Sequence, residues 1–262
     1  TRYVVFGAGG IDPAVRFTDL APGGAGLGRL VSSTGSGGDV AGFESSNNPG
    51  GGAIDSNPWH IAPVAGGVLV TDAGGNSLLR VADNGQTSLV TVFPARSIGG
   101  PAPTDSVPTG IAVGPDGAYY VGELTGFPFT PGAAQIYRVL PNGATSVFAG
   151  GFSSITDLSF GADGSLYVLE YDANGMRVPG NTGALTRLGA DGTRDTIFSE
   201  GLIGPTGLAI GSDGAFYVSN RGNEVGLGEV LRIAPVPEPG TWGLMLAGLL
   251  VLGLRGRLRR DQ

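Results

Sequence analysis

Four segments in the middle of the chain end in an acid or an amide after a short apolar run. These residues are Asp72, Glu123, Glu170 and Asn220. Carboxylate and amide oxygens are the ligands that Ca²⁺ prefers in proteins, and a bound cation can polarise a substrate oxygen. If the fold brings the four side chains together, they could form a calcium site. The simpler interpretation is that each side chain caps a turn by accepting a backbone hydrogen bond.

His60 and Asp157 are the candidate catalytic residues. His60 is the only His of the chain, so a zinc site built from several His is excluded, and a Ser-His-Asp triad would have to use it. The chain has no Cys, which excludes thiolate zinc sites, thiol catalysis and a disulfide scaffold. The chemistry open to these residues is hydrolysis, with His60 as a base and the strand-end acids holding a cation.

The charge of the chain limits its partners. The 262 residues carry a net charge of −7, and all 15 basic residues are Arg. Without residues 236–262, 11 Arg remain against 20 acids, a net charge of −9. Affinity for nucleic acid depends largely on neutralising phosphates, so this composition excludes nucleic acid as a partner. The 50 Gly and 18 Pro bound short apolar runs, which indicates many tight turns between strands rather than disorder.

A repeat of nearly fifty residues must position these side chains. Copies start near residues 57, 108, 154 and 205, and the equivalent residues His60, Gly110, Asp157 and Gly207 are 50, 47 and 50 positions apart. Each copy holds short apolar runs, and in three copies an Asp-Gly pair typical of a two-residue hairpin joins the first two. Four short antiparallel strands per repeat are typical of β-propeller blades.

The repeats therefore predict an all-β fold, a propeller over residues 1–235. The runs 3–6, 27–32 and 39–43 are interpreted as the second, third and fourth strands of a partial first blade within residues 1–46. We expect the ring to be incomplete at its N-terminal side. The repeated Arg of the third strands are expected to pair with blade carboxylates; they are Arg80, Arg138, Arg187 and Arg232.

One face of the propeller is the candidate ligand face. The Asp-Gly turns lie on one side, so the long connections between blades and between second and third strands all fall on the other. Aromatic residues in those connections offer apolar contact area: Trp59, Phe127, Phe129 and Tyr171. His60 and Asp157 are expected at the start of their strands, beside the central channel on this same face. The alternative is that the aromatic side chains only cover the blade ends.

The repeats resemble NHL-type propeller repeats, for example in the segment 68–81. The segments 121–129 and 47–58 look like those of ScyD/ScyE-type propellers, a family named for its association with biosynthesis of the extracellular pigment scytonemin. The resemblance covers roughly residues 3–234. It implies a six-bladed ring with the missing part at the N-terminus, and it implies little about chemistry. His60 departs from the Gly usual at its repeat position.

The C-terminal segment 236–262 is similar to PEP-CTERM sorting signals, which exosortases process in Gram-negative bacteria. The motif Val236, Pro237, Glu238 and Pro239 precedes an apolar stretch, 241–254, and a cluster formed by Arg255, Arg257, Arg259 and Arg260. An apolar helix of this length spans about 21 Å, short of a stable membrane crossing. The Arg cluster would hold its end on the cytoplasmic side. We expect a transient inner-membrane helix; a plain short anchor is the alternative.

These features favour an exported propeller in the periplasm, outer envelope or extracellular matrix of a Gram-negative bacterium. We expect it to act as a binding or structural module rather than an enzyme. Its expected partners are an exosortase-type enzyme and an unknown envelope component, matrix component or small molecule. A metal-dependent hydrolase or lactonase that uses channel carboxylates and Ca²⁺ is the alternative. An accessory role in assembling a secondary metabolite or matrix rests on the resemblance alone.

Overall fold

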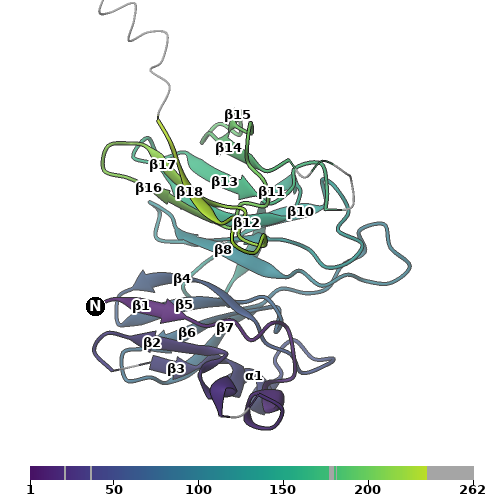
Figure 1. The fold of residues 1–262 in the computed structure, drawn as a ribbon, viewed down its shortest axis with the longest axis vertical. Coiled ribbons are helices and arrows are strands. Elements are labelled where there is room, and N and C mark those ends of the chain that lie inside the picture. Colours follow the sequence, from purple (N-terminus) through teal and green to yellow (C-terminus); the bar gives the residue numbers. More distant parts are fainter. Residues whose placement is uncertain (21, 36, 177–179, 181, 235–262) are drawn as a thin grey trace, which may run out of the picture.

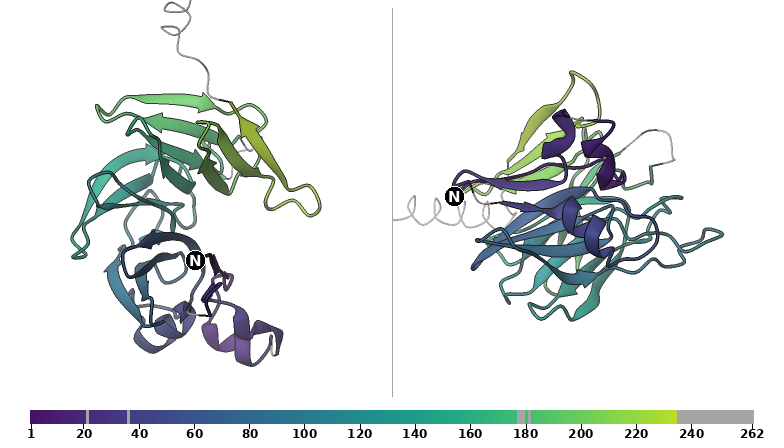
Figure 2. Two further views of the ribbon diagram at one scale, coloured as in Figure 1. Left: turned by 90° about the vertical axis from the view of Figure 1, so that its left-hand side faces the viewer. Right: turned by 90° about the horizontal axis from the view of Figure 1, so that it is seen from below.

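The computed structural model describes residues 1–234 except 21, 36, 177–179 and 181. It contains five antiparallel β-sheets that follow one another in sequence order along an arc, with the first and last sheets at its two ends (Figures 1 and 2). Each sheet is one blade, and in each blade strands consecutive in sequence are hydrogen-bonded neighbours.

The first three blades and the helices occupy the N-terminal part. Blade 1 comprises β1 (Tyr3–Val5), β2 (Arg29–Ser32) and β3 (Gly37–Asp39). Two 3₁₀ helices, η1 (Pro13–Phe17) and η2 (Gly23–Gly26), precede β2, and the α-helix α1 (Val40–Asn47) follows β3. Blade 2 comprises β4 (Pro58–Val64), β5 (Gly67–Asp72), β6 (Ser77–Ala82) and β7 (Thr87–Val92). Blade 3 comprises β8 (Pro108–Val113), β9 (Tyr119–Glu123), β10 (Ala134–Val139) and β11 (Thr145–Phe152).

The last two blades complete the described chain. Blade 4 comprises β12 (Ile155–Phe160), β13 (Leu166–Glu170), β14 (Ala184–Leu188) and β15 (Arg194–Phe198). Blade 5 comprises β16 (Gly207–Ile210), β17 (Phe216–Asn220) and β18 (Glu229–Ile233). The all-β propeller with four-stranded antiparallel blades is confirmed, although blades 1 and 5 have three strands and the described blades number five, not six.

The predicted strand over residues 39–43 was wrong, because the chain turns into α1 after Asp39. The Asp39 side chain caps this helix by accepting a 2.8 Å hydrogen bond from Gly42 N, and it also pairs with Arg16 of η1. The helix places Val40, Ala41 and Glu44 in buried positions. An Asp followed by a buried helical face is an N-cap signal, which competes with the apolar run for a strand assignment.

The first two strands of blades 3, 4 and 5 are joined by Asp-Gly turns, as the sequence predicts. Gly117, Gly164 and Gly214 have φ values of 76°, 77° and 75°, a region open to Gly. The Asp side chains of these turns form the predicted ion pairs with Arg: Arg138–Asp116 at 2.6 Å, Arg187–Asp163 at 3.1 Å and Arg232–Asp213 at 2.6 Å. Arg80 instead donates to the carbonyl of Ala65, because the turn of blade 2 has no Asp.

Apolar side chains fill the space between neighbouring blades. The largest cluster lies between blades 3 and 4 and includes Tyr120, Ile136, Phe152 and Ile155. Phe93 and Val121 belong to the cluster between blades 2 and 3, and Leu169 and Val218 to the one between blades 4 and 5. Each cluster draws on two blades, so removing apolar surface from water stabilises the order of the blades.

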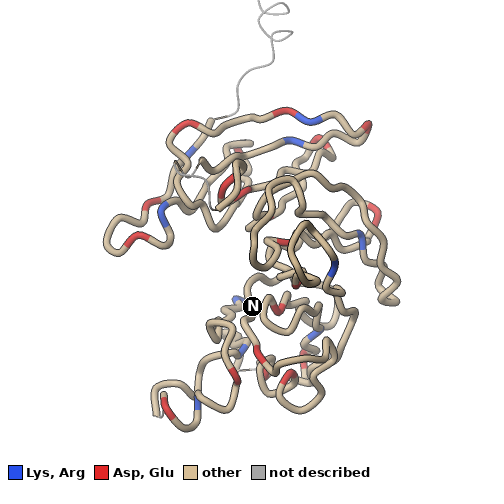
Figure 3. Tube along the Cα trace, turned by 90° about the vertical axis from the view of Figure 1, so that its right-hand side faces the viewer, with Lys and Arg blue, Asp and Glu red and all other residues tan. Residues whose placement is uncertain are grey.

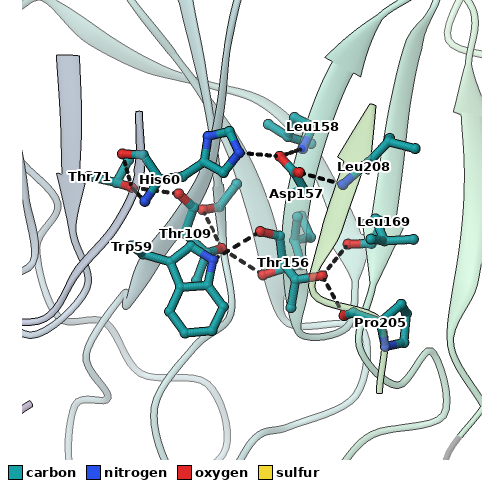
Figure 4. Close-up of polar contacts among 12 residues, drawn as sticks. Trp59, His60, Thr71, Thr109, Thr156, Asp157, Leu158, Leu169, Pro205 and Leu208 are labelled. Carbon is teal, nitrogen blue, oxygen red and sulfur yellow. Dashed lines mark hydrogen bonds and ion pairs between the residues drawn. The ribbon is translucent and has the colours of Figure 1, made fainter. Parts of the chain in front are cut away.

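Threonines connect neighbouring blades. Thr71 donates to the carbonyl of Thr109 at 2.6 Å, and Thr109 donates to the carbonyl of Ile155 at 2.6 Å (Figure 4). Thr156 continues the series with a 3.0 Å hydrogen bond to the carbonyl of Pro205. All three side chains are buried, so each hydrogen bond forms away from competing water.

None of the helices among the described residues is long and apolar enough to cross a membrane. The predicted apolar helix over 241–254 and the motif 236–239 lie outside the described residues.

Candidate site at the channel and the long-loop face

The structure brings His60 and Asp157 together, although they are 97 residues apart. His60 lies on β4 and Asp157 on β12, and β8 lies between and contacts both strands. The His60 Nε2 atom is 3.3 Å from Asp157 Oδ1 (Figure 4). The intervening position on β8 is Gly110, where a methyl group would lie 2.5 Å from the Asp157 Cα atom. The absence of a side chain at Gly110 therefore lets β8 lie close to β12, which permits the contact between His60 and Asp157.

Backbone groups fix the carboxylate of Asp157. It is 1% exposed and accepts hydrogen bonds from Leu158 N at 2.8 Å and from Leu208 N of blade 5 at 2.7 Å. His60 is half-buried, and its other ring nitrogen, Nδ1, is buried with no hydrogen-bond partner among the described residues. The nitrogen that would act as a base thus faces protein rather than solvent.

Asp157 sets the charge state of His60. Burial lowers the pKa of His60, but the hydrogen bond and the negative charge of Asp157, helped by the backbone of Ile61, outweigh it, so the net pKa is raised. A raised pKa means that the imidazolium stabilises the fold fully below pH 6.5, the ordinary His value. This contribution is lost as the pH rises through the folded-state pKa.

We predict that the Asp157→Asn substitution lowers the pKa of His60 below its ordinary value, because the burial remains while the charge is removed. His60 is the only His, so the ring ¹H–¹³C signals in an NMR pH titration report this group without assignment ambiguity. Asp163→Asn, which changes an exposed carboxylate at the opposite end of blade 4, is the control and should leave the midpoint in place. Equal midpoints in the wild type and in Asp157→Asn would contradict the contact.

The four strand-end residues Asp72, Glu123, Glu170 and Asn220 each accept a hydrogen bond from the loop that precedes the first strand of their own blade. Asp72 accepts from Ser56 Oγ at 2.7 Å and from Asn57 N at 2.6 Å. Glu123 accepts from Ser106 Oγ at 2.7 Å, and Glu170 accepts from Ser153 N at 2.7 Å. Asn220 Oδ1 accepts from Ile203 N at 2.8 Å. In every case the donor lies in the loop just before the first strand of the blade, so the side chain fastens that loop.

The side chains of these four strand-end residues do not form a shared metal site. Among the described residues, no group of three or more His, Asp or Glu is placed to hold a metal ion. Burial raises the pKa of Asp72 and raises the pKa of Glu170 to about 6, although hydrogen bonds to both carboxylates act in the opposite direction. The calcium assignment stays a prediction that no contact in the described chain tests.

Glu123 has more partners than its equivalents. Its carboxylate also accepts from Gln135 N at 2.9 Å and from the Tyr137 hydroxyl at 3.2 Å, and it forms an ion pair with Arg96. Glu123 is fully buried, whereas the Arg96 side chain is 25% exposed. Sequence reasoning missed Arg96, because it lies in the long loop between β7 and β8, outside the repeat.

The candidate ligand face carries one exposed aromatic pair. Phe127 and Phe129, in the loop between β9 and β10, form an edge-to-face pair with ring centres 6.2 Å apart, and Phe127 is 67% exposed. Tyr171 and Trp59 are half-buried: Tyr171 packs against Gly204, and Trp59 donates to the carbonyl of Thr156 at 3.3 Å. Aromatic contact area on this face stays a prediction; Phe127 is the exposed ring of the four, and Trp59 forms a hydrogen bond between two blades.

Sequence reasoning also missed the threonines that connect the blades and an acidic cavity beside α1. Thr109 and Thr156 stand at one position of the repeat, which is the signal that could have identified two members of the series. Figure 3 shows acidic residues distributed along the described chain, with fewer basic residues among them. The charge distribution thus agrees with the net negative composition.

Comparisons with known proteins give a sorting motif and a fold. Residues 235–260 match the PEP-CTERM protein-sorting motif. No match was found among curated proteins. The fold is similar to that of a catalytically inactive virginiamycin B lyase from Staphylococcus aureus solved with quinupristin, with 19% identity, a TM-score of 0.50, and 80% of this chain and 63% of that chain covered.

A second similar structure is a gluconolactonase from Xanthomonas campestris, with 18% identity, a TM-score of 0.52, and 70% of this chain and 63% of that chain covered. The chain therefore spans less than two thirds of the length of either structure. At these identities the likeness shows the fold and no activity. The chain is thus a β-propeller with a PEP-CTERM motif, which implies processing by an exosortase-type enzyme and supports export to the envelope or extracellular space.

Proposed function

We propose that this protein is an exported, envelope-associated or extracellular β-propeller that acts as a binding or structural module. The sorting motif at 235–260 is the observation that carries the proposal, because it supports the compartment in which any partner would be met. The expected ligand face, with its long loops and the exposed Phe127 ring, would supply a contact surface. The buried Nδ1 atom of His60 argues against the channel as a hydrolytic site.

The finer parts of this proposal rest on resemblance. The ScyD/ScyE-type segments and NHL-like repeats support an accessory role in assembling a secondary metabolite or extracellular matrix. The order of motif, apolar stretch and Arg cluster supports a Gram-negative host and a transient inner-membrane helix before processing. The expected partner is then an envelope or matrix component, or a small molecule that collects there.

We predict that the double substitution Phe127→Ser/Phe129→Ser reduces capture of an envelope or matrix component by at least about tenfold, the loss that about 1.4 kcal/mol of binding energy represents. The full-length protein, immobilised and incubated with the envelope fraction and the secreted matrix of its host, is the bait. Val113→Ser is the matched control, since Val113 is 40% exposed beside the Asp-Gly turn on the opposite face. Equal capture by all three proteins would remove the loop face from the proposal.

The alternative function is a metal-dependent hydrolase or lactonase, favoured by the contact between His60 and Asp157. Turnover of a lactone or ester that is lost in both His60→Ala and Asp157→Ala would establish it and overturn the binding-module proposal. Elemental mass spectrometry of the chelator-free protein supplies the second readout: one equivalent of calcium would favour the channel acids as ligands.

A further inference from the structure

An acidic cavity lies away from the channel contact, between α1 and the loop that follows β5. Its volume is about 120 Å³. Three acidic side chains line it, those of Glu44, Asp55 and Asp105, together with Asn76 and the small residues 51–53 and 74–75. No Lys or Arg is among the lining residues. The cavity is therefore a negatively charged space without a counter-charge of its own.

Glu44 is a buried acid of this cavity with one carboxylate oxygen that lacks a hydrogen-bond donor in the described part of the chain. It lies on α1 and is 1% exposed, and its Oε2 atom has no hydrogen-bond partner among the described residues. A methyl group placed on Gly75, a residue that lines the cavity, would lie 2.7 Å from this oxygen. The free oxygen is thus directed at the cavity wall. A buried carboxylate without a donor costs free energy, which a ligand with N–H or O–H groups would offset.

The surroundings of Glu44 add negative charge, and no Lys or Arg among the lining residues balances it. Asp72 Oδ2 is near the same point, 3.2 Å from the methyl group placed on Gly75, but both Asp72 oxygens already accept hydrogen bonds from Ser56, Asn57 and Gly75. Burial, then the charges of Asp72 and Asp55, raise the pKa of Glu44 to about 7. The cavity also adjoins the C-terminal half of α1, whose last turn holds no basic residue.

We propose that this cavity binds a primary ammonium group of another molecule, with Glu44 as its buried acceptor and the other lining oxygens around it. An ammonium group has three donors and no acceptor, which suits the unpartnered Glu44 oxygen and the other carboxylates that line the cavity. Metal ions fit less well, because no three acidic or His side chains of the described chain are placed to hold one. The chain has no Lys, so the ammonium comes from a free amine or from a lysine of a partner.

The test is thermal unfolding of the full-length protein with methylammonium chloride, using tetramethylammonium chloride at equal concentration as the control without N–H donors. We expect methylammonium to raise Tm by about 3–6 °C at ten times its dissociation constant, and tetramethylammonium to leave Tm unchanged. A lysine amide as effective as methylammonium would identify a lysine side chain as the source. A lysine amide without effect would identify a small free amine.

Glu44→Gln tests the acceptor, because it keeps the shape of the side chain and removes its charge. We expect it to abolish the Tm shift, whereas Glu200→Gln, the same change at an exposed position, should retain it. In the absence of amine, Glu44→Gln should unfold at or above the Tm of the wild type above pH 7, since it removes the repulsion with Asp72 and Asp55. Asp55→Asn, at a half-buried position, is the second variant and should weaken the shift.

The effect of methylammonium should be larger at pH 8 than at pH 6, as Glu44 loses its proton over this range. The titratable groups around Glu44 are Asp72, Asp55 and Asp105. Three elements pack on α1: η1 contributes Arg16, which is already paired with Asp39, and β2 contributes the exposed Arg29. The third element, β7, contributes no titratable group. A concentration on the order of 100 mM methylammonium should nearly saturate even a weak site. The absence of a Tm shift at this concentration would overturn the proposal. A larger shift with calcium that Glu44→Gln removes would overturn it in favour of a metal site.

Discussion

Replacing Glu123 with Ala is expected to lower the free energy of unfolding by about 3–5 kcal/mol, the largest effect among the polar contacts described. Glu123 is fully buried at the end of β9. Its loss would leave Arg96 without its carboxylate, and it would also remove the acceptor of the Ser106 and Tyr137 hydroxyls. Urea unfolding followed by circular dichroism measures the change as a lower midpoint at an unchanged slope.

Glu224→Ala is the matched control for this experiment. Glu224 also pairs with an Arg, at 2.9 Å from Arg221, but both side chains are about one-third exposed. Solvent screens such a pair, so its loss should cost less than about 1 kcal/mol. If both substitutions cost the same, Glu123 does not fasten the loop before β8 as its hydrogen bonds indicate.

The second large effect is expected for Gly110→Ala, which should destabilise the protein by about 2–3 kcal/mol. The added methyl group would lie 2.5 Å from the Asp157 Cα atom and 2.8 Å from the Leu158 nitrogen. These are backbone atoms of β12, so relief requires moving a whole strand rather than turning a side chain. Thermal and urea unfolding measure the loss, and the NMR signals of the His60 ring should shift, because the distance between β4 and β12 changes.

Gly207→Ala is the control at the equivalent position of blade 5. There the nearest atom to an added methyl group is Ser219 Cβ at 3.6 Å, an ordinary van der Waals distance. The substitution should be neutral or stabilise by about 0.4–1 kcal/mol, because Ala reduces the freedom of the unfolded chain. A Gly110→Ala protein as stable as Gly207→Ala would show that β8 and β12 are not packed as closely as described.

Features that depend on near neighbours in the chain could be predicted from the sequence. The Asp-Gly turns follow from the backbone freedom of Gly, and the pairing of Arg138, Arg187 and Arg232 with the turn aspartates follows from strand register within a hairpin pair. The same holds for the sorting motif, which is a linear pattern at 235–260. Each of these is fixed by residues at most about 25 positions apart.

Features that depend on how blades meet were decided by the tertiary structure alone. His60 contacts Asp157 across 97 positions because Gly110 lets β8 approach β12 closely. The cavity beside Glu44 combines side chains from α1, from the loop before β4 and from the loop before β8, and α1 itself replaced a predicted strand. Apolar side chains fix the packing between blades and loops, so a sequence pattern shows which residues are polar but not which of them face one another.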